Sequence, residues 1–149
     1  MSNILYLKPI TIEDVKWLDK TEHRFIPLDR RKLLVQESEK GLSQGEFFRF
    51  YLIMKEKEVV GVINMCGHGK DVVSVAPEIL EEYRGKGYGQ QSLELAYKIA
   101  KDMGFKELTA GIREENLASI NLHIKLGFTF VKNQITKRGN RIKVYSKTL

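Results

Sequence analysis

The chain has 149 residues, of which 42% are hydrophobic and 30% are charged. A chain of this length buries about 68–70% of its unfolded surface on folding, so it needs neither a disulfide nor a metal to stabilise it. No apolar run approaches the ~20 residues that span a bilayer, which argues against a membrane partner. We therefore expect one compact domain over residues 1–149.

Cys66 is the only cysteine and lies in an apolar run, residues 59–66. It has no second cysteine with which to form an intramolecular disulfide or a zinc site. We interpret Cys66 as a small buried side chain. The sequence thus predicts a cytoplasmic protein without a metal.

The charge is unbalanced, because 25 Lys and Arg residues stand against 19 Asp and Glu residues, for a net charge of +6. Such a surplus can bind nucleic acid, an anionic membrane surface or a phosphate-rich small ligand. Many basic residues lie near the end of the chain, where Tyr145 is the only aromatic side chain among them. No RNA- or DNA-binding signature occurs there. We expect no nucleic-acid partner and interpret these residues as a strand edge protected by charge.

The first part of the chain predicts four strands and two helices. Strands are expected at residues 4–10, 47–54, 59–66 and 72–80, and helices after Thr11 and at residues 30–40. Pro77 cannot donate a ladder hydrogen bond, so we expect a bulge, a splayed or outer edge, or a strand that begins late. Residues 21–45 carry no readable motif apart from the helix that Gly41 closes.

The second part of the chain predicts two more helices, each followed by glycine. Apolar residues at helical spacing after Gly89 indicate a helix that ends at Gly104, and residues 116–126 indicate another that stops at Gly127. A strand is expected between them at residues 105–112. The last two strands are expected as a hairpin, at residues 128–133 and 141–147.

A glycine-rich segment, Arg84-Gly85-Lys86-Gly87-Tyr88-Gly89, lies between a predicted strand and a predicted helix. Glycines let the backbone approach an anion closely, and the N-terminus of the following helix adds a partial positive charge. The spacing is neither the dinucleotide fingerprint G-x-G-x-x-G nor the P-loop G-x-x-x-x-G-K-[ST]. The segment therefore predicts a phosphate site of another kind.

Two motifs resemble those of the GNAT N-acetyltransferase superfamily. Residues 84–89 match R/Q-x-x-G-x-G/A, the family's loop for the acetyl-CoA pyrophosphate, and residues 116–128 are similar to N-x-x-[AS]-x-x-x-[YH]-x-x-x-G-F. A helix and a strand separate the two motifs, as in that family. The resemblance covers residues 47–131 well and the first 45 residues in outline.

The resemblance implies an α/β (α+β) fold with a mixed, mostly antiparallel sheet of six to seven strands, about four helices and a splayed central strand. It implies acetyl-CoA as cosubstrate and transfer of the acetyl group directly to a primary amine of a small molecule or a protein N-terminus, by a monomer or homodimer. The residues expected to contact the cofactor are Ile79, Leu80, Arg84, Gly85, Lys86, Gly87, Tyr88, Gly89, Asn116 and Ser119.

Two residues are candidates for the proton transfers. His123 stands where many relatives have a tyrosine that protonates the leaving thiolate, and it either does so or packs in the helix. Glu78 is the carboxylate nearest the expected splay, and it is either the base for the amine or a solvent-facing strand residue. The alternative function is a non-catalytic module that binds or senses acyl-CoA with the same fold.

Overall fold

The computed structural model describes residues 4–149, and within this range the chain forms eight strands, three α-helices and three 3₁₀ helices, the last marked η. The first three residues of the expected domain lie outside the described residues. The strands are β1 (Leu5–Pro9), β2 (Leu42–Ser43), β3 (Glu46–Lys55), β4 (Glu58–His68), β5 (Val72–Ile79), β6 (Glu107–Arg113), β7 (Thr129–Ile135) and β8 (Arg141–Thr148). The helices are η1 (Ile12–Lys20), η2 (Glu22–Phe25), α1 (Leu28–Lys40), η3 (Glu81–Tyr83), α2 (Tyr88–Asp102) and α3 (Leu117–Lys125).

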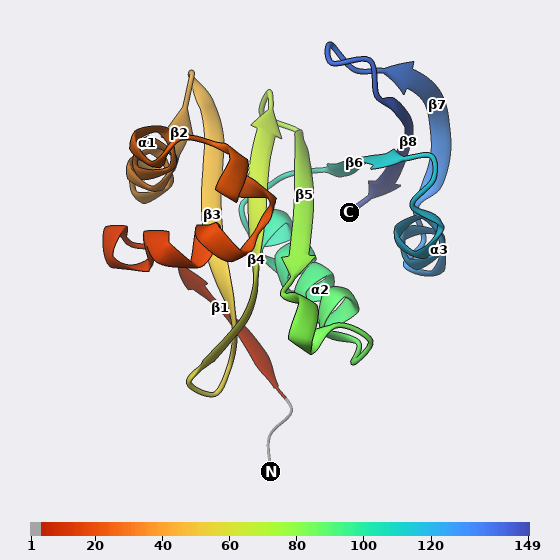
Figure 1. The fold of residues 1–149 in the computed structure, drawn as a ribbon. Coiled ribbons are helices and arrows are strands. Elements are labelled where there is room, and N and C mark those ends of the chain that lie inside the picture. The colour runs from red at the N-terminus through yellow and green to blue at the C-terminus, as the bar shows by residue number, and fades with distance from the viewer. Residues whose placement is uncertain (1–3) are drawn as a thin grey trace.

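One open sheet organises the fold, in the strand order β1-β3-β4-β5-β6-β8-β7, and β2 pairs with β3 (Figure 1). Neighbouring strands run antiparallel except β5 and β6, which are parallel. The expected mixed, mostly antiparallel sheet is thus confirmed. The sheet has eight strands where six to seven were expected. The additional strand is β2, whose two residues are too few to show an alternating pattern in the sequence.

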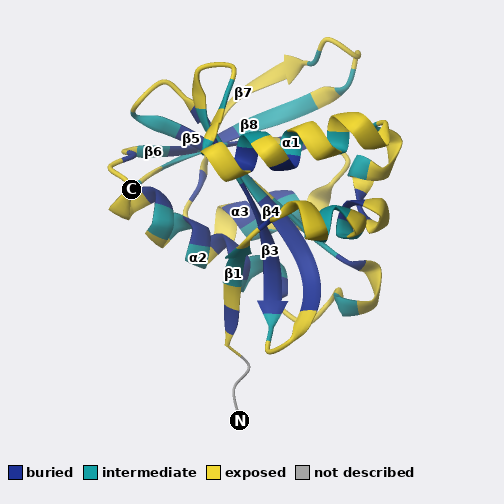
Figure 2. Ribbon diagram, turned by 90° about the vertical axis from the view of Figure 1, so that its left-hand side faces the viewer, coloured by how far each residue is buried: buried dark blue, intermediate teal, exposed yellow. Residues whose placement is uncertain are grey.

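Helices cover both faces of the sheet because β3 and β4 bury side chains on both sides (Figure 2). Phe50 and Leu52 belong to a core cluster with residues of η1 and α1, whereas Tyr51 and Ile53 belong to a second cluster with residues of α2 and α3. We call these sides the η face and the α2 face. None of the helices between residues 4 and 149 has the length and apolar character needed to cross a membrane.

The strand β5 parts from β6 soon after the two strands meet. They pair over residues 72–74 of β5 and 107–109 of β6, although β5 continues to Ile79 and β6 to Arg113. Figure 1 shows β6, β7 and β8 turning away from β5 beyond this point. The splayed central strand is therefore confirmed, and the β5 segment 75–79 has an open edge on the side away from β4.

Pro77 lies on this open edge. The Leu80 amide donates to Val60 O at 2.9 Å, so the backbone groups of Leu80 and Glu78 point toward β4, and those of Pro77 and Ile79 point the other way. The pairing of β4 with β5 has no register shift at Pro77, which rules out a bulge there. Pro77 is tolerated because its missing N–H would face the open edge.

The segment 21–45, in which the sequence predicts only the helix near residues 30–40, contains η2 as well as α1 and β2. Asp19 of η1 forms an ion pair with Arg31 of α1. The helix expected after Thr11 is the 3₁₀ helix η1, and the Asp14 carboxylate accepts hydrogen bonds from the Thr11 amide and hydroxyl, both at 3.0 Å. The ion pair thus joins η1 to α1 on the η face.

Gly61 of β4 allows β5 to pack close beside it. A Cβ atom at this position would lie 2.4 Å from the backbone oxygen of Glu78. Gly61→Ala must therefore displace the β5 backbone, and we expect a loss of about 1–3 kcal/mol in the free energy of unfolding, measured by urea denaturation. Gly89→Ala is the matched control, because the nearest atoms to its Cβ lie at 3.9 Å and alanine favours a helix by roughly 0.5–1 kcal/mol. Equal stability of Gly61→Ala and the parent would contradict the close approach.

Candidate active site

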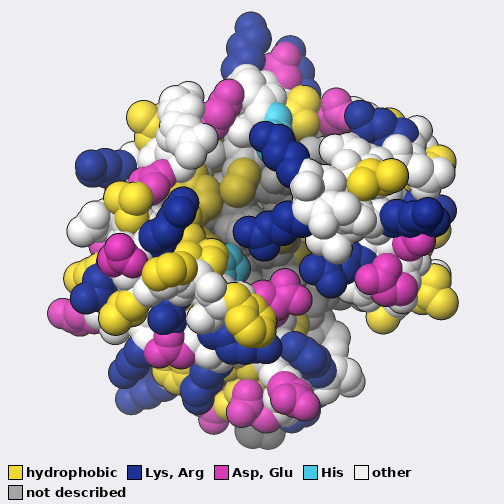
Figure 3. Space-filling view, turned by 45° about the horizontal axis from the view of Figure 1, so that its top comes forward, with side chains coloured by type: hydrophobic (Ala, Val, Ile, Leu, Met, Phe, Trp, Pro, Cys, Tyr) yellow, Lys and Arg dark blue, Asp and Glu magenta, His cyan; other side chains and the backbone are white. Residues whose placement is uncertain are grey.

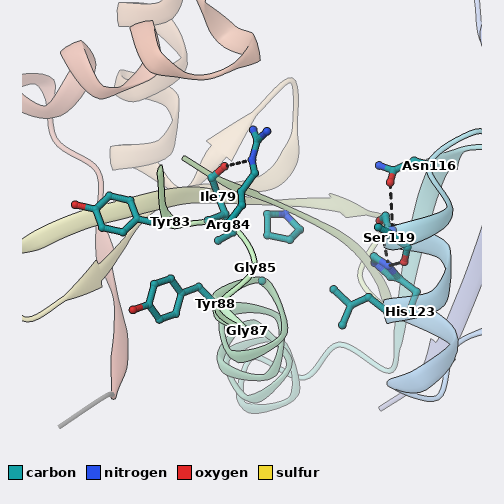
Figure 4. Close-up of a pocket in the computed structure, with 13 residues that line it drawn as sticks. Ile79, Tyr83, Arg84, Gly85, Gly87, Tyr88, Asn116, Ser119 and His123 are labelled. Carbon is teal, nitrogen blue, oxygen red and sulfur yellow. Dashed lines mark hydrogen bonds between the residues drawn. The ribbon is translucent and has the colours of Figure 1, made fainter. Parts of the chain in front are cut away.

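A cavity of about 370 Å³ opens on the α2 face, between the end of β5, the start of α2 and α3 (Figure 4). It lies beside the open edge of β5. Its lining residues come from three stretches of sequence, and they are Pro77, Ile79, Tyr83, Arg84, Gly85, Gly87, Tyr88, Gly89, Asn116, Ala118, Ser119, Leu122 and His123. The two motifs, far apart in the sequence, thus form opposite walls of one cavity.

The glycine-rich loop forms the wall at the start of α2. Gly85 and Gly87 have φ angles of +80° and +83°, a region that side chains with a Cβ disfavour, and Gly87 is the N-cap of the 15-residue helix α2. The first amide groups of a helix have no partner within it, and the helix dipole places positive charge there. This end of the cavity is therefore suited to an anion.

Arg84 adds a positive charge beside the glycines. Its Nε donates to the backbone oxygen of Ile79 at 3.0 Å, which fixes the side chain at the end of β5. Figure 4 shows the guanidinium extending away from Gly85 and Gly87, toward the side from which the η helices approach the sheet. Arg84 thus lies where β5 meets the anion-binding end of the cavity.

The α3 wall is built on two local hydrogen bonds. The Asn116 side-chain oxygen accepts from the Ser119 amide at 3.2 Å, so Asn116 caps α3 as expected. His123 lies one turn further on, 4% exposed, with Nδ1 2.7 Å from the backbone oxygen of Ser119. Its ring packs edge-on against Phe128, 4.9 Å between centroids.

The contact with Ser119 fixes the tautomer of His123. A carbonyl oxygen can only accept, so Nδ1 carries the hydrogen and Nε2 of the neutral ring carries a lone pair. Burial lowers the pKa of His123 below its usual 6.5, and the hydrogen bond to Ser119 opposes this shift in part. A neutral His123 can accept a proton or hydrogen bond through Nε2, but it can donate from this atom only as the imidazolium.

Three of the residues expected in the site lie outside the cavity. Leu80 is buried and its amide pairs with β4, while Lys86 stands over the ring of Tyr83, 5.9 Å from its centroid. Glu78 points to the η face, where both carboxylate oxygens lie 3.1 Å from the Glu22 amide nitrogen. Burial raises the pKa of Glu78, and the hydrogen bond from Glu22 opposes this rise.

Sequence reasoning did not assign four of the lining residues to the site: Pro77, Tyr83, Ala118 and Leu122. Ala118 and Leu122 are variable positions of the second motif, so only the helical spacing from Asn116 and Ser119 could have indicated them. Among residues 4–149 there is no group of three or more His, Cys, Asp or Glu side chains that could hold a metal ion.

The lowered pKa of His123 makes stability depend on pH. The unfolded chain takes up a proton at this histidine at a higher pH than the folded chain does, so the free energy of unfolding falls as the pH falls below 6.5. Urea denaturation between pH 8 and 5.5 should therefore show a smaller loss for His123→Phe than for the parent. His68→Phe, which removes an exposed imidazole, is the control for loss of a histidine elsewhere in the chain. Equal losses in all three proteins would contradict the buried, neutral state of His123.

Two curated relatives align with part of the chain. The uncharacterized N-acetyltransferase YobR of Bacillus subtilis (strain 168) is 33% identical over 89 residues, which cover 56% of this chain and 32% of that protein. The L-methionine sulfoximine/L-methionine sulfone acetyltransferase of Pseudomonas aeruginosa is 35% identical over 63 residues, 42% of this chain and 36% of that protein. The chain spans about a third of the length of these relatives.

Solved structures with the same fold cover nearly the whole chain. The acetyltransferase of Salmonella typhimurium that modifies the N-terminal serine of ribosomal protein L7/L12 superposes with a TM-score of 0.81 at 17% identity, covering 99% of this chain and 96% of that one. A ribosomal L7/L12 α-N-protein acetyltransferase in complex with coenzyme A gives a TM-score of 0.81 at 18% identity, with the same coverage of 99% and 96%. These likenesses concern the fold.

A match of the sequence to a protein-family model identifies the family. Residues 12–128 match the model described as the acetyltransferase (GNAT) family, a span that includes both motifs and every residue that lines the cavity. More than half of the chain is matched. The splayed strand β5 and the glycine-rich loop at the start of α2 agree with the architecture that the resemblance implies. The chain belongs to the GNAT acetyltransferase family.

Proposed function

We propose that residues 1–149 form one domain that binds acetyl-CoA and transfers its acetyl group directly to a primary amine, on a small molecule or at a protein N-terminus. The observation that carries this proposal is the cavity, which joins an anion-binding helix N-terminus to an open strand edge. Coenzyme A has two matching parts, a pyrophosphate and a pantetheine arm with two amides. The complex of a similarly folded acetyltransferase with coenzyme A supports this assignment.

The pyrophosphate would lie at the start of α2. There the free amides at the helix N-terminus would meet the anion, and Arg84, fixed on Ile79, would add positive charge from the end of β5. Lys86, outside the cavity, would add a mobile charge at its rim. Tyr88 contributes its amide, because its ring points away from α3 (Figure 4).

The pantetheine arm would lie along the open edge of β5 like an added strand. Ile79 would offer its backbone amide to this edge, since its carbonyl already accepts from Arg84 Nε, and Pro77 would offer a carbonyl. Leu80 positions the edge by its bond to β4 rather than by touching the cofactor. On the opposite wall, Asn116 and Ser119 line the cavity, and the hydrogen bond between them caps α3.

The leaving thiolate needs a proton, and His123 is the candidate donor from α3. Donation from Nε2 requires the imidazolium, because Nδ1 already donates to Ser119. The lowered pKa makes this form scarce at neutral pH. His123 would therefore act as an acid mainly in mildly acidic solution, and at higher pH its Nε2 would accept a hydrogen bond from the cofactor.

Release of free CoA from acetyl-CoA tests the proposed function. The parent protein should release CoA only when an acceptor is added from a panel of L-methionine sulfone, a peptide with an N-terminal serine, a polyamine and aminoglycosides. Mass spectrometry should show the acetylated amine in the same tubes. Tight binding of CoA without acetylation of any amine in the panel would instead support the acyl-CoA-binding or sensing module.

Substitution of Gly87, which has a positive φ, tests whether the glycine-rich loop binds the pyrophosphate. Gly87→Val forces a β-branched residue into the left-handed region where the backbone would meet phosphate, so the Kd for CoA should rise at least tenfold, about 1.4 kcal/mol, by isothermal titration calorimetry. Gly139→Val is the matched control, because Gly139 has a φ of +85° and open space around it but lies in the β7–β8 turn. An unchanged Kd for CoA in Gly87→Val would show that this loop does not bind the pyrophosphate.

A further inference from the structure

His23 belongs to η2, on the η face of the sheet. Its ring packs edge-on against Phe50 of β3, with 5.1 Å between the centroids. Phe50 pairs with Asn64 of β4, and Asn64 pairs with Ala76 of β5, the second residue beyond the last pair with β6. The ring therefore packs over β3, two strands from β5, on the side of the sheet opposite the cavity. The link from η2 to β5 is the hydrogen bond from the Glu22 amide to Glu78.

Thr21 fixes which ring nitrogen of His23 carries the hydrogen. Its hydroxyl donates to the backbone oxygen of Leu18 at 2.8 Å, so the only hydrogen on this oxygen is already used. The same oxygen lies 3.1 Å from the His23 amide nitrogen and 3.1 Å from Nδ1 of the ring. Nδ1 must therefore be the donor, and Nε2 carries the lone pair.

The lone pair on Nε2 can be reached from solvent. Nε2 of His23 has no hydrogen-bond partner within the described part of the chain, yet it is not among that part's fully buried polar atoms without a hydrogen bond. A hydrogen-bonded Nδ1 with a free Nε2 is the arrangement that makes a histidine a base. Burial also lowers the pKa of His23, which keeps the ring neutral at pH 7, although the charge of Glu22 opposes the shift.

Glu78 holds η2 in place beside this histidine. Its two carboxylate oxygens accept from the amide of Glu22, the residue before His23. The other charged groups around the pair are Glu22 and Arg24 of η2 and Arg84, which follows η3. Glu78 is thus directed at the backbone of η2, whereas Nε2 of His23 has no partner among the described residues.

We propose that His23, rather than Glu78, removes the proton from the incoming amine, and that Glu78 and Thr21 are positioning residues. This inference rests on the proposed function. Figure 3 shows the molecule hollowed near the centre of this view, with hydrophobic, basic and histidine side chains around the hollow. An amine there would reach the thioester through the opening between residues 75–79 of β5 and the end of β6.

The protons and electrons balance as follows. The ammonium form of the acceptor gives one proton to Nε2 of His23, and the free amine attacks the thioester carbonyl carbon. The carbon–sulfur bond breaks, and the thiolate leaves with the electron pair. The nitrogen loses a second proton, which ends on the thiolate to give free CoA, and the imidazolium of His23 returns its proton to solvent.

The activity test compares three variants with the best acceptor of the CoA-release panel. His23→Gln should lower kcat/KM at pH 7 by about 10²–10⁴-fold, with partial recovery toward pH 9 as free amine accumulates. Glu78→Gln keeps an oxygen that can accept from the Glu22 amide, so its loss should stay below tenfold. His68→Gln, an exposed histidine at the end of β4, is the control and should remain within twofold of the parent.

A second measurement is independent of the acceptor. Nitrogen-15 NMR of the three histidines, assigned with the same variants, should show His23 neutral at pH 7 with its hydrogen on Nδ1. Thr21→Val should shift the tautomer and lower kcat/KM, and Thr21→Ser should restore both. If His23→Gln does not fold, the variants Thr21→Val and Thr21→Ser still test whether His23 is the base.

Four results would overturn the proposal. A hydrogen on Nε2 in the parent would exclude a base there, and a loss of 10²-fold in Glu78→Gln with less than tenfold in His23→Gln would assign the base to Glu78. Full turnover in His23→Gln would remove this role alone, since the parent would still be an acetyltransferase. No acetylation by the parent with any amine would remove the proposed function and the base together.

Discussion

The end of pairing between β5 and β6 after residue 74 is the constraint on which the site depends. Parallel strands normally stay hydrogen-bonded along their length, because burying an unpaired backbone N–H or C=O group destabilises the fold. Here β5 keeps its full ladder with β4 and leaves its other edge open, so the strand is held firmly on one side while its free groups face a cavity. The cavity exists because the sheet stays open at this point.

The opening also divides the chemistry between two layers. On the α2 face, a glycine loop, a helix N-terminus and the capped α3 provide an environment for phosphate and amide groups. On the η face, Thr21, His23 and Glu78 form a network of hydrogen bonds on a short 3₁₀ helix. The two groups of residues share no hydrogen bond in the described chain. Under the proposed function, cofactor binding and removal of the proton from the amine can therefore be altered separately.

The sequence predicted well what depends on local backbone chemistry. Glycine is needed at Gly85, Gly87 and Gly127 because φ is positive there, and the cap at Asn116 follows from its side chain. These features are properties of a few consecutive residues, so the cavity walls could be assigned before the structure was known. The splay itself entered through the family resemblance.

The network on the η face could not be predicted in this way. His23 became a candidate only through Phe50, which is distant in sequence, and through the amide that Glu22 directs at Glu78. The segment around it has no strong amphipathic period, since η2 has only four residues. The side to which Glu78 points also depended on the register of β5 against β4, two strands that approach closely at Gly61.

Pro77 has a consequence for the chain before it binds any ligand. An open strand edge is a template on which a strand of another molecule can add, and this is a common start of aggregation. An invading strand would need the donors of β5 on its free side, and at Pro77 there is none. The residue thus leaves carbonyl groups for small amide ligands but interrupts the ladder that a polypeptide would require. The chain can keep an unpaired edge in its sheet and still resist self-association there.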